Sequence, residues 1–193
     1  MTAEFKIVEE AKKPLGMHPK KFAMWLFIAS VTMLFASLTS AYIVRQAEGN
    51  WLYFELPVLL YWSCAIIVLS SISMQMAYWA AKKDLLERVK ILVSATAFLG
   101  LAFLICQLQA WGQLVENSVY LVGNPSGSFL YILTGLHGLH LVSAIVYLFI
   151  LLVAAYRFKI HSKSLVQIEM CATYWHFLGG LWLYLFIFLL LFR

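Results

Sequence analysis

Charged residues are scarce in this sequence, and long parts of it contain none. Of its 193 residues, 12% are Asp, Glu, Lys or Arg, whereas 63% are hydrophobic, and the mean hydropathy is +0.85. A chain of this length does not enclose enough volume to hide so much apolar surface in a water-soluble core. The composition therefore excludes a soluble globular protein and predicts a membrane protein.

Cysteine is also scarce, and its spacing excludes several kinds of site. Cys64, Cys106 and Cys171 lie far apart within apolar stretches and form no Cys-x-x-Cys pair. We interpret them as small buried apolar residues rather than as a disulfide framework or a zinc site. The sequence also has no glycine-rich phosphate loop and no nucleophile beside a base. We expect this chain to catalyse no reaction by itself, and its cysteine spacing indicates no metal site.

Five uncharged stretches are long enough to cross a membrane. They cover about residues 22–44, 56–81, 91–113, 129–156 and 170–192. Each exceeds the roughly 20 residues that a helix needs to cross a hydrocarbon core about 30 Å thick. In lipid, only helices and closed barrels satisfy the backbone. We predict an all-α polytopic membrane protein, with a cytoplasmic arm at 1–21 and one transmembrane domain of five helices at 22–193.

The absence of Asp, Glu, Lys and Arg from these stretches excludes a further class. Ion and proton transporters usually place such residues within the membrane, because a relay needs groups that gain and lose protons. Here the only intramembrane groups that titrate near neutrality are His137, His140 and His176. Three histidines without a carboxylate partner make a poor proton relay.

The basic residues are distributed asymmetrically, which predicts the orientation of the chain. Twelve of the fourteen Lys and Arg residues lie in the N-terminal arm, the second loop and the fourth loop, whereas only Arg45 and Arg193 lie on the other side. Since Lys and Arg in short loops stay in the cytoplasm, we expect the N-terminus inside and the C-terminus outside. The net charge of +5 follows from this asymmetry and suits anionic lipids, so nucleic acid is not an expected partner.

The stretch Leu133–Leu152 contains His137 and His140, three residues apart on one face of a helix. A haem could take one of them together with His176 from a facing helix. Alternatively, the three histidines could form hydrogen bonds within the bundle, for which Gln107, Gln109 and Gln113 offer partners. Spacing alone leaves both interpretations open.

Two helices carry stripes of small residues, which allow close helix packing. Ser63, Ser70, Ser73 and Ala77 form the stripe in the second span, and Ala29, Ala36, Ser37 and Ser40 the stripe in the first. Packing within the chain accounts for most of this signal. Helices so apolar on most faces also indicate a subunit embedded in a larger assembly.

Two sequence signatures resemble a known family. "LTGLHGLHLVSAI" followed by "EMCATYWHFLGGLWLYLF" is similar to TGxHGxHV and ExxxxYWHFVDxVW in subunit III of the haem-copper oxidases. The first span, "KKFAMWLFIASVTMLFASLTSAYIV", also resembles that family, and the similarity runs from about Lys20 to Phe192. The length corresponds to the five-helix bacterial form.

This resemblance implies a structural role for the motif residues. The family's motif positions are occupied by His137, His140, Glu169, Tyr174, Trp175 and His176. In that family the haems and copper belong to subunits I and II, so the resemblance implies no cofactor in this chain. Its main partner is then subunit I, with subunit II, other membrane subunits and a respiratory supercomplex as further partners. The histidines are then expected to satisfy polar groups within the bundle.

The resemblance also implies bound phospholipid, in a cleft between the first two helices and the last three. The residues expected to anchor lipid are Trp25, Tyr42, Arg45, Trp51, Tyr53, Lys82 and Lys83. Arg45 would meet a phosphate from the outer side, and Lys82 or Lys83 from the inner side.

The chain departs from the family where the family often has a carboxylate. It reads Ser30-Val31 in the first span, Leu178-Gly179 in the last, and Gly112 in the third. These losses argue against direct proton handling at those positions but leave the scaffold and lipid roles untouched. Because several of the family's carboxylates are absent together, no buried charge is left without its partner.

The function that the resemblance implies is that of a non-catalytic subunit III of a proton-pumping terminal oxidase in the bacterial inner membrane. One alternative is an accessory subunit of a quinol oxidase or a nitric oxide reductase. Another is a haem-binding, quinol-oxidising membrane anchor that uses His137 or His140 with His176.

The loop 115–129 is rich in turn-forming residues. We expect it to be an external loop that is ordered by contact with something else.

Overall fold

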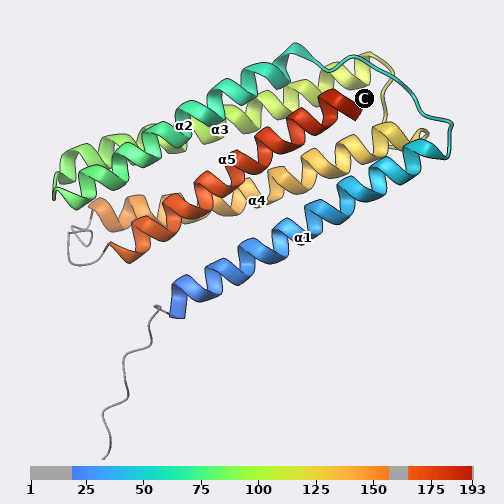
Figure 1. Cartoon of the computed structure of the whole chain (residues 1–193). Coiled ribbons are helices and arrows are strands. Elements are labelled where there is room, and N and C mark those ends of the chain that lie inside the picture. Colours follow the sequence, from blue (N-terminus) through green and yellow to red (C-terminus); the bar gives the residue numbers. More distant parts are fainter. Residues whose placement is uncertain (1–18, 157–164, 193) are drawn as a thin grey trace, which may run out of the picture.

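The computed structural model describes residues 19–156 and 165–192, and its regular structure there is entirely helical (Figure 1). The five helices are α1 (Pro19–Ala47), α2 (Val58–Lys82), α3 (Leu86–Glu116), α4 (Pro125–Tyr156) and α5 (Val166–Phe192). Each is long and apolar enough to cross a membrane, which confirms the prediction of five such helices. Most of the predicted N-terminal arm, up to residue 18, lies outside the described residues.

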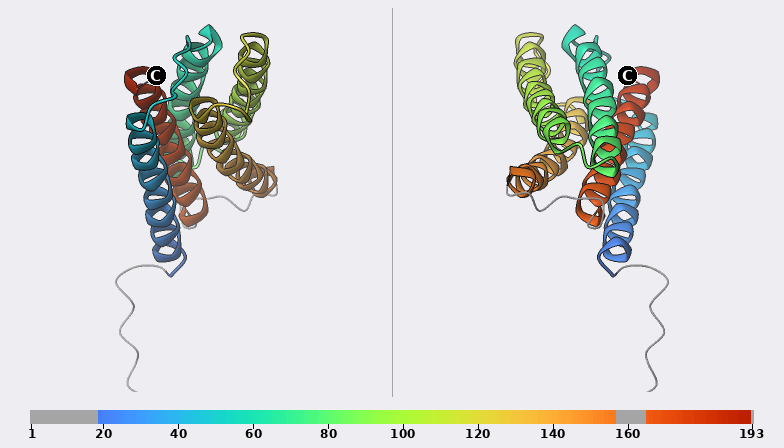
Figure 2. Two further views of the ribbon diagram at one scale, coloured as in Figure 1. Left: turned by 90° about the vertical axis from the view of Figure 1, so that its right-hand side faces the viewer. Right: turned by 90° about the vertical axis from the view of Figure 1, so that its left-hand side faces the viewer.

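The helices form a packed group of four with α1 at its side. α2 lies along α3, α5 packs on both α2 and α4, and α3 packs on α4. α1 approaches only α4 and α5 within the described ranges. Both views of Figure 2 show α1 beside α5, with α1 and α3 on opposite flanks of the molecule. The expected division into the first two helices and the last three is therefore not supported, because α2 pairs with α3 rather than with α1.

A tight turn explains why α2 and α3 pair so closely. The backbone N–H of Lys83 donates to the Ala80 carbonyl at 3.1 Å, and Asp84 adopts a left-handed φ of 52°. A connection this short forces the two helices to run antiparallel as neighbours. Farther along, Ser73 Oγ donates to the Leu92 carbonyl across the pair at 3.0 Å.

At the opposite end of the molecule, Asn124 joins two loops. Its Oδ1 accepts from the backbone N–H of Ser126 at 3.0 Å, which caps the first turn of α4, where Pro125 occupies the first helical position. The same side chain contacts the loop between α1 and α2: Oδ1 accepts from Leu52 N–H at 3.3 Å, and Nδ2 donates to the Asn50 carbonyl at 3.2 Å. The loop before α4 is thus ordered by another segment of this chain.

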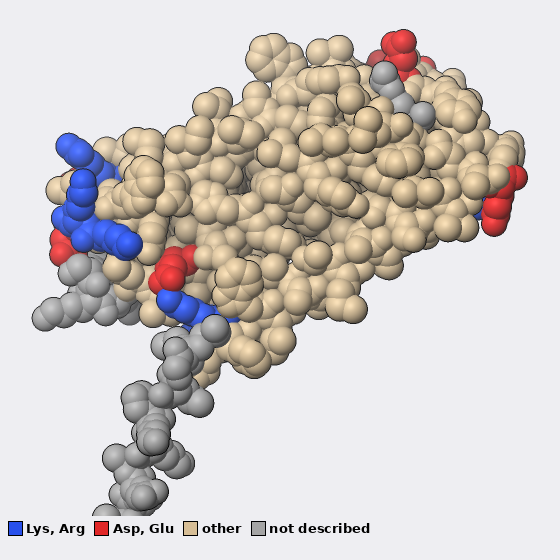
Figure 3. Space-filling view, in the orientation of Figure 1, with Lys and Arg blue, Asp and Glu red and all other residues tan. Residues whose placement is uncertain are grey.

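Charged side chains gather at the two ends, and a wide uncharged band separates them (Figure 3). One end of the molecule contains the first residues of α1, α3 and α5 and the last residues of α2 and α4. The described cations at this end are Lys20, Lys21, Lys82, Lys83, Arg88 and Lys90. We call this the basic end. Arg45 is near the other end, and the remaining seven Lys and Arg residues, including Arg157, Lys159 and Lys163, lie outside the described residues. The predicted orientation, with the basic end in the cytoplasm, stays a prediction.

Candidate functional site

The two histidines of the fourth span lie in different interfaces. His137 is 0% exposed and packs between α3 and α5, with its ring centroid 5.9 Å from Phe103 and 5.1 Å from Trp182. His140 is half-buried and faces α1, with its ring centroid 5.8 Å from that of Phe35. Three residues of helical rotation therefore direct the two rings toward different helices, although they were predicted to share a face.

The polar contacts of the three histidines differ. His140 Nδ1 lies 2.7 Å from the Leu136 carbonyl, and His176 Nε2 lies 3.0 Å from Gln75 Oε1. These two histidines have the predicted kind of polar partner. Neither ring nitrogen of His137 has a hydrogen-bond partner among the described residues.

None of the three glutamines expected to serve the histidines donates to or accepts from a histidine ring among the described residues. Gln107 Nε2 donates to Ser63 Oγ at 3.4 Å, and Gln109 and Gln113 are exposed on α3. The partner that the structure gives His176 is Gln75 on α2, which sequence reasoning missed. Gln75 is the only carboxamide side chain in the second span, and that was the available signal.

Two buried tryptophans attach α5 to α2. Trp175 Nε1 donates to Ser70 Oγ at 3.1 Å, and Trp182 Nε1 donates to Ser63 Oγ at 3.2 Å. The seven-residue spacing is the same on both helices, so the two bonds repeat after two turns. The small-residue stripe predicted on α2 thus serves packing within the chain, and Trp182 joins the motif residues as a contact that sequence reasoning missed.

Gly100 provides the space that Trp175 occupies. A Cβ atom at Gly100 would lie 2.7 Å from Trp175 Cη2 and 3.2 Å from Cζ2. Both atoms belong to a rigid ring in a side chain that is 1% exposed. The α3 backbone therefore approaches the indole directly, which only glycine permits here.

Tyr174 connects α5 to α4 on the side that faces α1. Its hydroxyl lies 2.8 Å from Ser143 Oγ and donates to the His140 carbonyl at 3.2 Å. The ring of Phe27 from α1 packs edge-on against Tyr174, with centroids 5.6 Å apart. This contact places the family-type motif of α5 at the junction of three helices.

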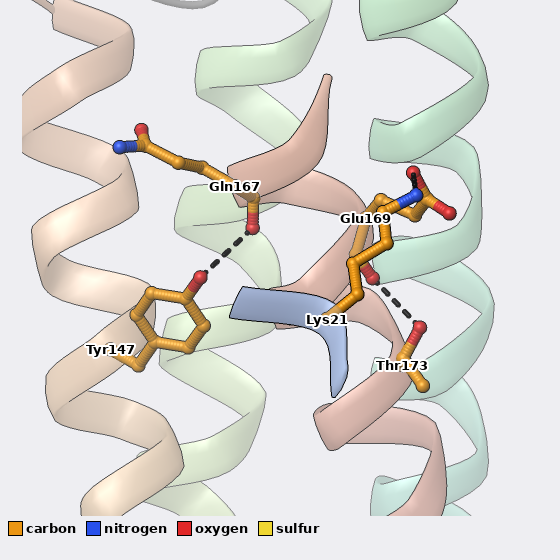
Figure 4. A network of polar contacts seen from close by, with 5 residues as sticks. All are labelled: Lys21, Tyr147, Gln167, Glu169 and Thr173. Carbon is orange, nitrogen blue, oxygen red and sulfur yellow. Dashed lines mark hydrogen bonds and ion pairs between the residues drawn. The ribbon is translucent and has the colours of Figure 1, made fainter. Parts of the chain in front are cut away.

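At the basic end, an ion pair joins α1 to α5 (Figure 4). Lys21 Nζ lies 2.7 Å from Glu169 Oε2, and both side chains are partly exposed. In the same region, Thr173 Oγ1 donates to the Glu169 carbonyl at 2.8 Å and Tyr147 Oη donates to the Gln167 carbonyl at 3.2 Å. The motif residue Glu169 thus connects α5 to α1 through Lys21.

Several residues predicted to anchor lipid have other surroundings. Tyr42 is 1% exposed, and its ring centroid lies 4.7 Å from that of Trp51. The Tyr42 hydroxyl donates to the Phe192 carbonyl at 3.2 Å. Tyr42 therefore packs inside the chain, which corrects its interpretation as a lipid anchor. Trp51 is only partly buried, and its lipid role stays a prediction. Trp25 and Tyr53, by contrast, are 53% and 70% exposed.

The predicted basic anchors lie at the two ends of the molecule. Arg45 pairs with Glu48 at 2.9 Å in an i, i+3 arrangement. Lys82 Nζ lies 4.9 Å from the centroid of the Tyr78 ring. Lys83 lines a groove of about 150 Å³ together with Arg88 and Trp79. All three cations remain at the edge of the uncharged band.

An apolar groove runs between α1 and α5. It consists of two adjoining hollows, of about 460 and 400 Å³, that share Ala36 and Tyr184. The outer hollow is also lined by Thr39, Ser40, Ile43, Ile187, Phe188, Leu191 and Phe192, and the inner one by Thr32, Phe35, His176, Phe177, Gly180 and Leu181. A cleft was expected between the first two helices and the last three, but this groove lies between the first helix and the last.

Comparison with known proteins gives one family. The family model described as cytochrome c oxidase subunit III matches residues 51–193. The chain is 29% identical over 171 residues to a probable cytochrome c oxidase subunit 3 of Nocardia farcinica, covering 83% of this chain and 82% of that protein. It is 26% identical over 172 residues to a probable quinol oxidase subunit 3 of Staphylococcus saprophyticus, covering 86% and 85%. With the cytochrome c oxidase subunit 3 of Bacillus sp. PS3 it shares 23% identity over 192 residues, covering 96% and 92%.

Proposed function

The chain belongs to the cytochrome c oxidase subunit III family, and from this membership we propose that it is the non-catalytic subunit III of a proton-pumping haem-copper terminal oxidase. It is a multi-pass membrane protein and part of a multi-subunit oxidase complex. In this proposal subunits I and II carry the haems and copper, and this chain supports subunit I and holds phospholipid in a bacterial inner membrane. Since the relatives include cytochrome c and quinol oxidase subunits, the proposal covers both electron donors.

The observation that carries this proposal is that the motif residues of α5 contact the other helices. Glu169 pairs with α1, Tyr174 bonds to α4, and Trp175 and His176 bond to α2. Each of these polar groups is engaged in holding another helix. Such an arrangement supports a scaffold role for the run that most resembles the family.

The groove between α1 and α5 supports the lipid-holding part of the proposal. From His176 to Phe192 it extends sixteen residues along α5, or roughly 24 Å at about 1.5 Å per residue. One leaflet of a hydrocarbon core is about 15 Å thick, so an acyl chain fits along this length. Ile43 lines the groove, and Arg45 lies two residues beyond it. A cation at this position favours binding of a lipid phosphate.

Co-purification in mild detergent tests the scaffold role. We expect the chain to be recovered with subunit I, and its deletion to leave the initial rate of oxygen reduction nearly unchanged while shortening the active lifetime. A folded, monodisperse chain that is obtained alone and retains a Soret band would refute the proposal in favour of the haem-binding membrane anchor.

Filling the groove tests the lipid role. Gly180 is exposed in the inner hollow, and a Cβ atom there meets nothing within 4 Å, so Gly180→Phe projects a ring into the groove without an initial clash. We expect this variant to lose phospholipid, measured by mass spectrometry of the purified complex, and to inactivate faster during turnover. Gly112→Phe is the matched control, since Gly112 is equally open but lies on α3. Equal lipid content in the two variants would count against lipid in this groove.

A further inference from the structure

Two polar side chains inside the bundle of α2, α3, α4 and α5 (the α2–α5 bundle) have atoms that form no hydrogen bond. Both ring nitrogens of His137 and Oε1 of Gln107 are buried and have no hydrogen-bond partner among the described residues. The other end of the Gln107 amide is engaged, because Nε2 donates to Ser63 Oγ. A buried polar atom without a partner destabilises the fold, so a ligand that satisfies Gln107 Oε1 together with one ring nitrogen of His137 is favoured.

The packing of α3 against α4 places the two side chains at the same depth. Trp111 Nε1 on α3 donates to Thr134 Oγ1 on α4 at 3.1 Å, which defines the register of this antiparallel pair. Gln107 lies four residues before Trp111, and His137 lies three residues after Thr134. Because the two helices are antiparallel, Gln107 and His137 each lie about one turn from the Trp111–Thr134 bond, on the side of the basic end.

The two side chains also share neighbours. The Trp182 ring packs beside His137, with centroids 5.1 Å apart, and its Nε1 donates to the same Ser63 Oγ to which Gln107 donates. Phe103, one turn before Gln107 on α3, lies edge-on to both rings. Side chains from four helices thus meet at this level.

We propose that His137 and Gln107 bind one buried water molecule between α3 and α4. A neutral imidazole has one N–H donor and one acceptor nitrogen, and Gln107 Oε1 is an acceptor. A water molecule accepts from the imidazole N–H and donates to Oε1, or donates to both acceptors in the other tautomer. Buried waters make about two to four hydrogen bonds to otherwise unsatisfied groups, and the two bonds proposed here lie within that range. One imidazole and one amide oxygen are fewer ligands than the three or four protein ligands typical of zinc sites.

A structure of the complete oxidase complex in native lipid, at a resolution that shows ordered water, tests the proposal directly. We expect one density peak about 2.7–3.2 Å from both Gln107 Oε1 and a ring nitrogen of His137. A direct His137–Gln107 hydrogen bond without a peak would overturn the proposal. A peak about 2.1 Å from the ring nitrogen would also overturn it, because that distance indicates a metal.

A double-mutant cycle in the assembled complex gives a second test. His137→Phe and Gln107→Leu should each lower the temperature at which this chain leaves the complex by several degrees, because each leaves the water and the other side chain with an unpaired group. The double variant should lose less than the sum of the two shifts, since the water and both its partners are then removed together. Additive shifts would overturn the proposal.

Gln109→Leu is the control for the loss of an amide from α3, because Gln109 is exposed two residues from Gln107. We expect it to leave the dissociation temperature unchanged. If a single variant at His137 or Gln107 fails to assemble, the density test on the unmodified complex still decides the question.

Discussion

α1 and α5 are similar in length and both are apolar enough to cross a membrane, yet they are packed in different ways. α1 has 29 residues, of which five are buried, whereas α5 has 27 residues, of which twelve are buried. The buried residues of α1 are spaced three or four apart, at Ile28, Val31, Phe35, Thr39 and Tyr42, and so form one narrow stripe. α5 instead contacts α1, α2 and α4.

The contacts that attach the two helices differ in kind as well. α5 is held to α2 by two indole–serine bonds between buried groups. α1 is held to α5 by a partly exposed ion pair, a Thr39–Tyr184 contact of 3.0 Å, and a bond from Gln46 Nε2 to the Phe192 carbonyl at 2.9 Å. The groove lies between the ion pair and the Gln46–Phe192 bond, and Thr39 and Tyr184 line it. We therefore expect changes in the α2–α5 bundle to affect assembly and changes at α1 to affect the attachment of a single helix.

The largest expected effect is that of Gly100→Leu, because the α3 backbone touches the Trp175 ring there. Overpacking a dense interior costs about 1–3 kcal/mol or more, and a rigid indole has little room to move. We expect a strong loss of this chain from the purified complex, measured by quantitative gel analysis. Gly112→Leu, in open space on the same helix, should assemble normally. Normal assembly of Gly100→Leu would show that the bundle is less tightly packed than we describe.

A smaller effect is expected from His176→Leu, which removes the contact with Gln75 between α5 and α2. The half-buried Gln75 amide then loses its partner, at a cost of about 1–3 kcal/mol. We expect a lower yield of assembled complex, with the assembled fraction retaining its initial turnover. Glu169→Gln, seven residues away on the same helix, should leave both quantities nearly unchanged. The reverse pattern would mean that the roles of Glu169 and His176 are inverted.

The ion pair at the basic end should contribute less, because both of its side chains are partly exposed. Such pairs typically contribute less than about 1 kcal/mol. We expect Lys21→Glu to increase hydrogen exchange in the first turns of α1, and the swapped pair Lys21→Glu with Glu169→Lys to restore protection. Salt should weaken the difference, because it screens exposed charges. Equal exchange in the single and swapped variants would show that this pair does not attach α1.

The smallest expected effect is that of Arg45→Gln at the other end of α1. Within the part of the chain that the structure describes, Arg45 forms only an i, i+3 pair with Glu48, and such helix pairs contribute a few tenths of a kcal/mol. If Arg45 holds a lipid phosphate, this variant should shorten the time over which the oxidase remains active while leaving its initial rate unchanged. The same two quantities should be measured for Lys82→Gln, which removes a cation at the basic end, beside the other leaflet. An immediate loss of initial rate in Arg45→Gln would contradict this account.

The locations of the five helices could be predicted from the sequence, but the partners within the bundle could not. Trp175 and Ser70 are 105 residues apart, and Lys21 and Glu169 are 148 residues apart. Many serines and lysines are equally plausible partners at such separations. The error at Tyr42 has a related cause: aromatic residues near the ends of a span suit the membrane interface and the interior equally well, and only packing distinguishes the two environments.

The sequence by itself determined which segments cross the membrane, because the cost of burying charge and unsatisfied backbone in lipid depends on local composition. The motifs of the fourth and fifth spans likewise indicated the family. Only the tertiary structure decided which faces are buried, that α1 lies apart from α2, and that His137 and His140 belong to different interfaces. The physical reason is that lipid is as apolar as the protein core, so hydrophobicity does not distinguish a face that contacts lipid from one that contacts another helix.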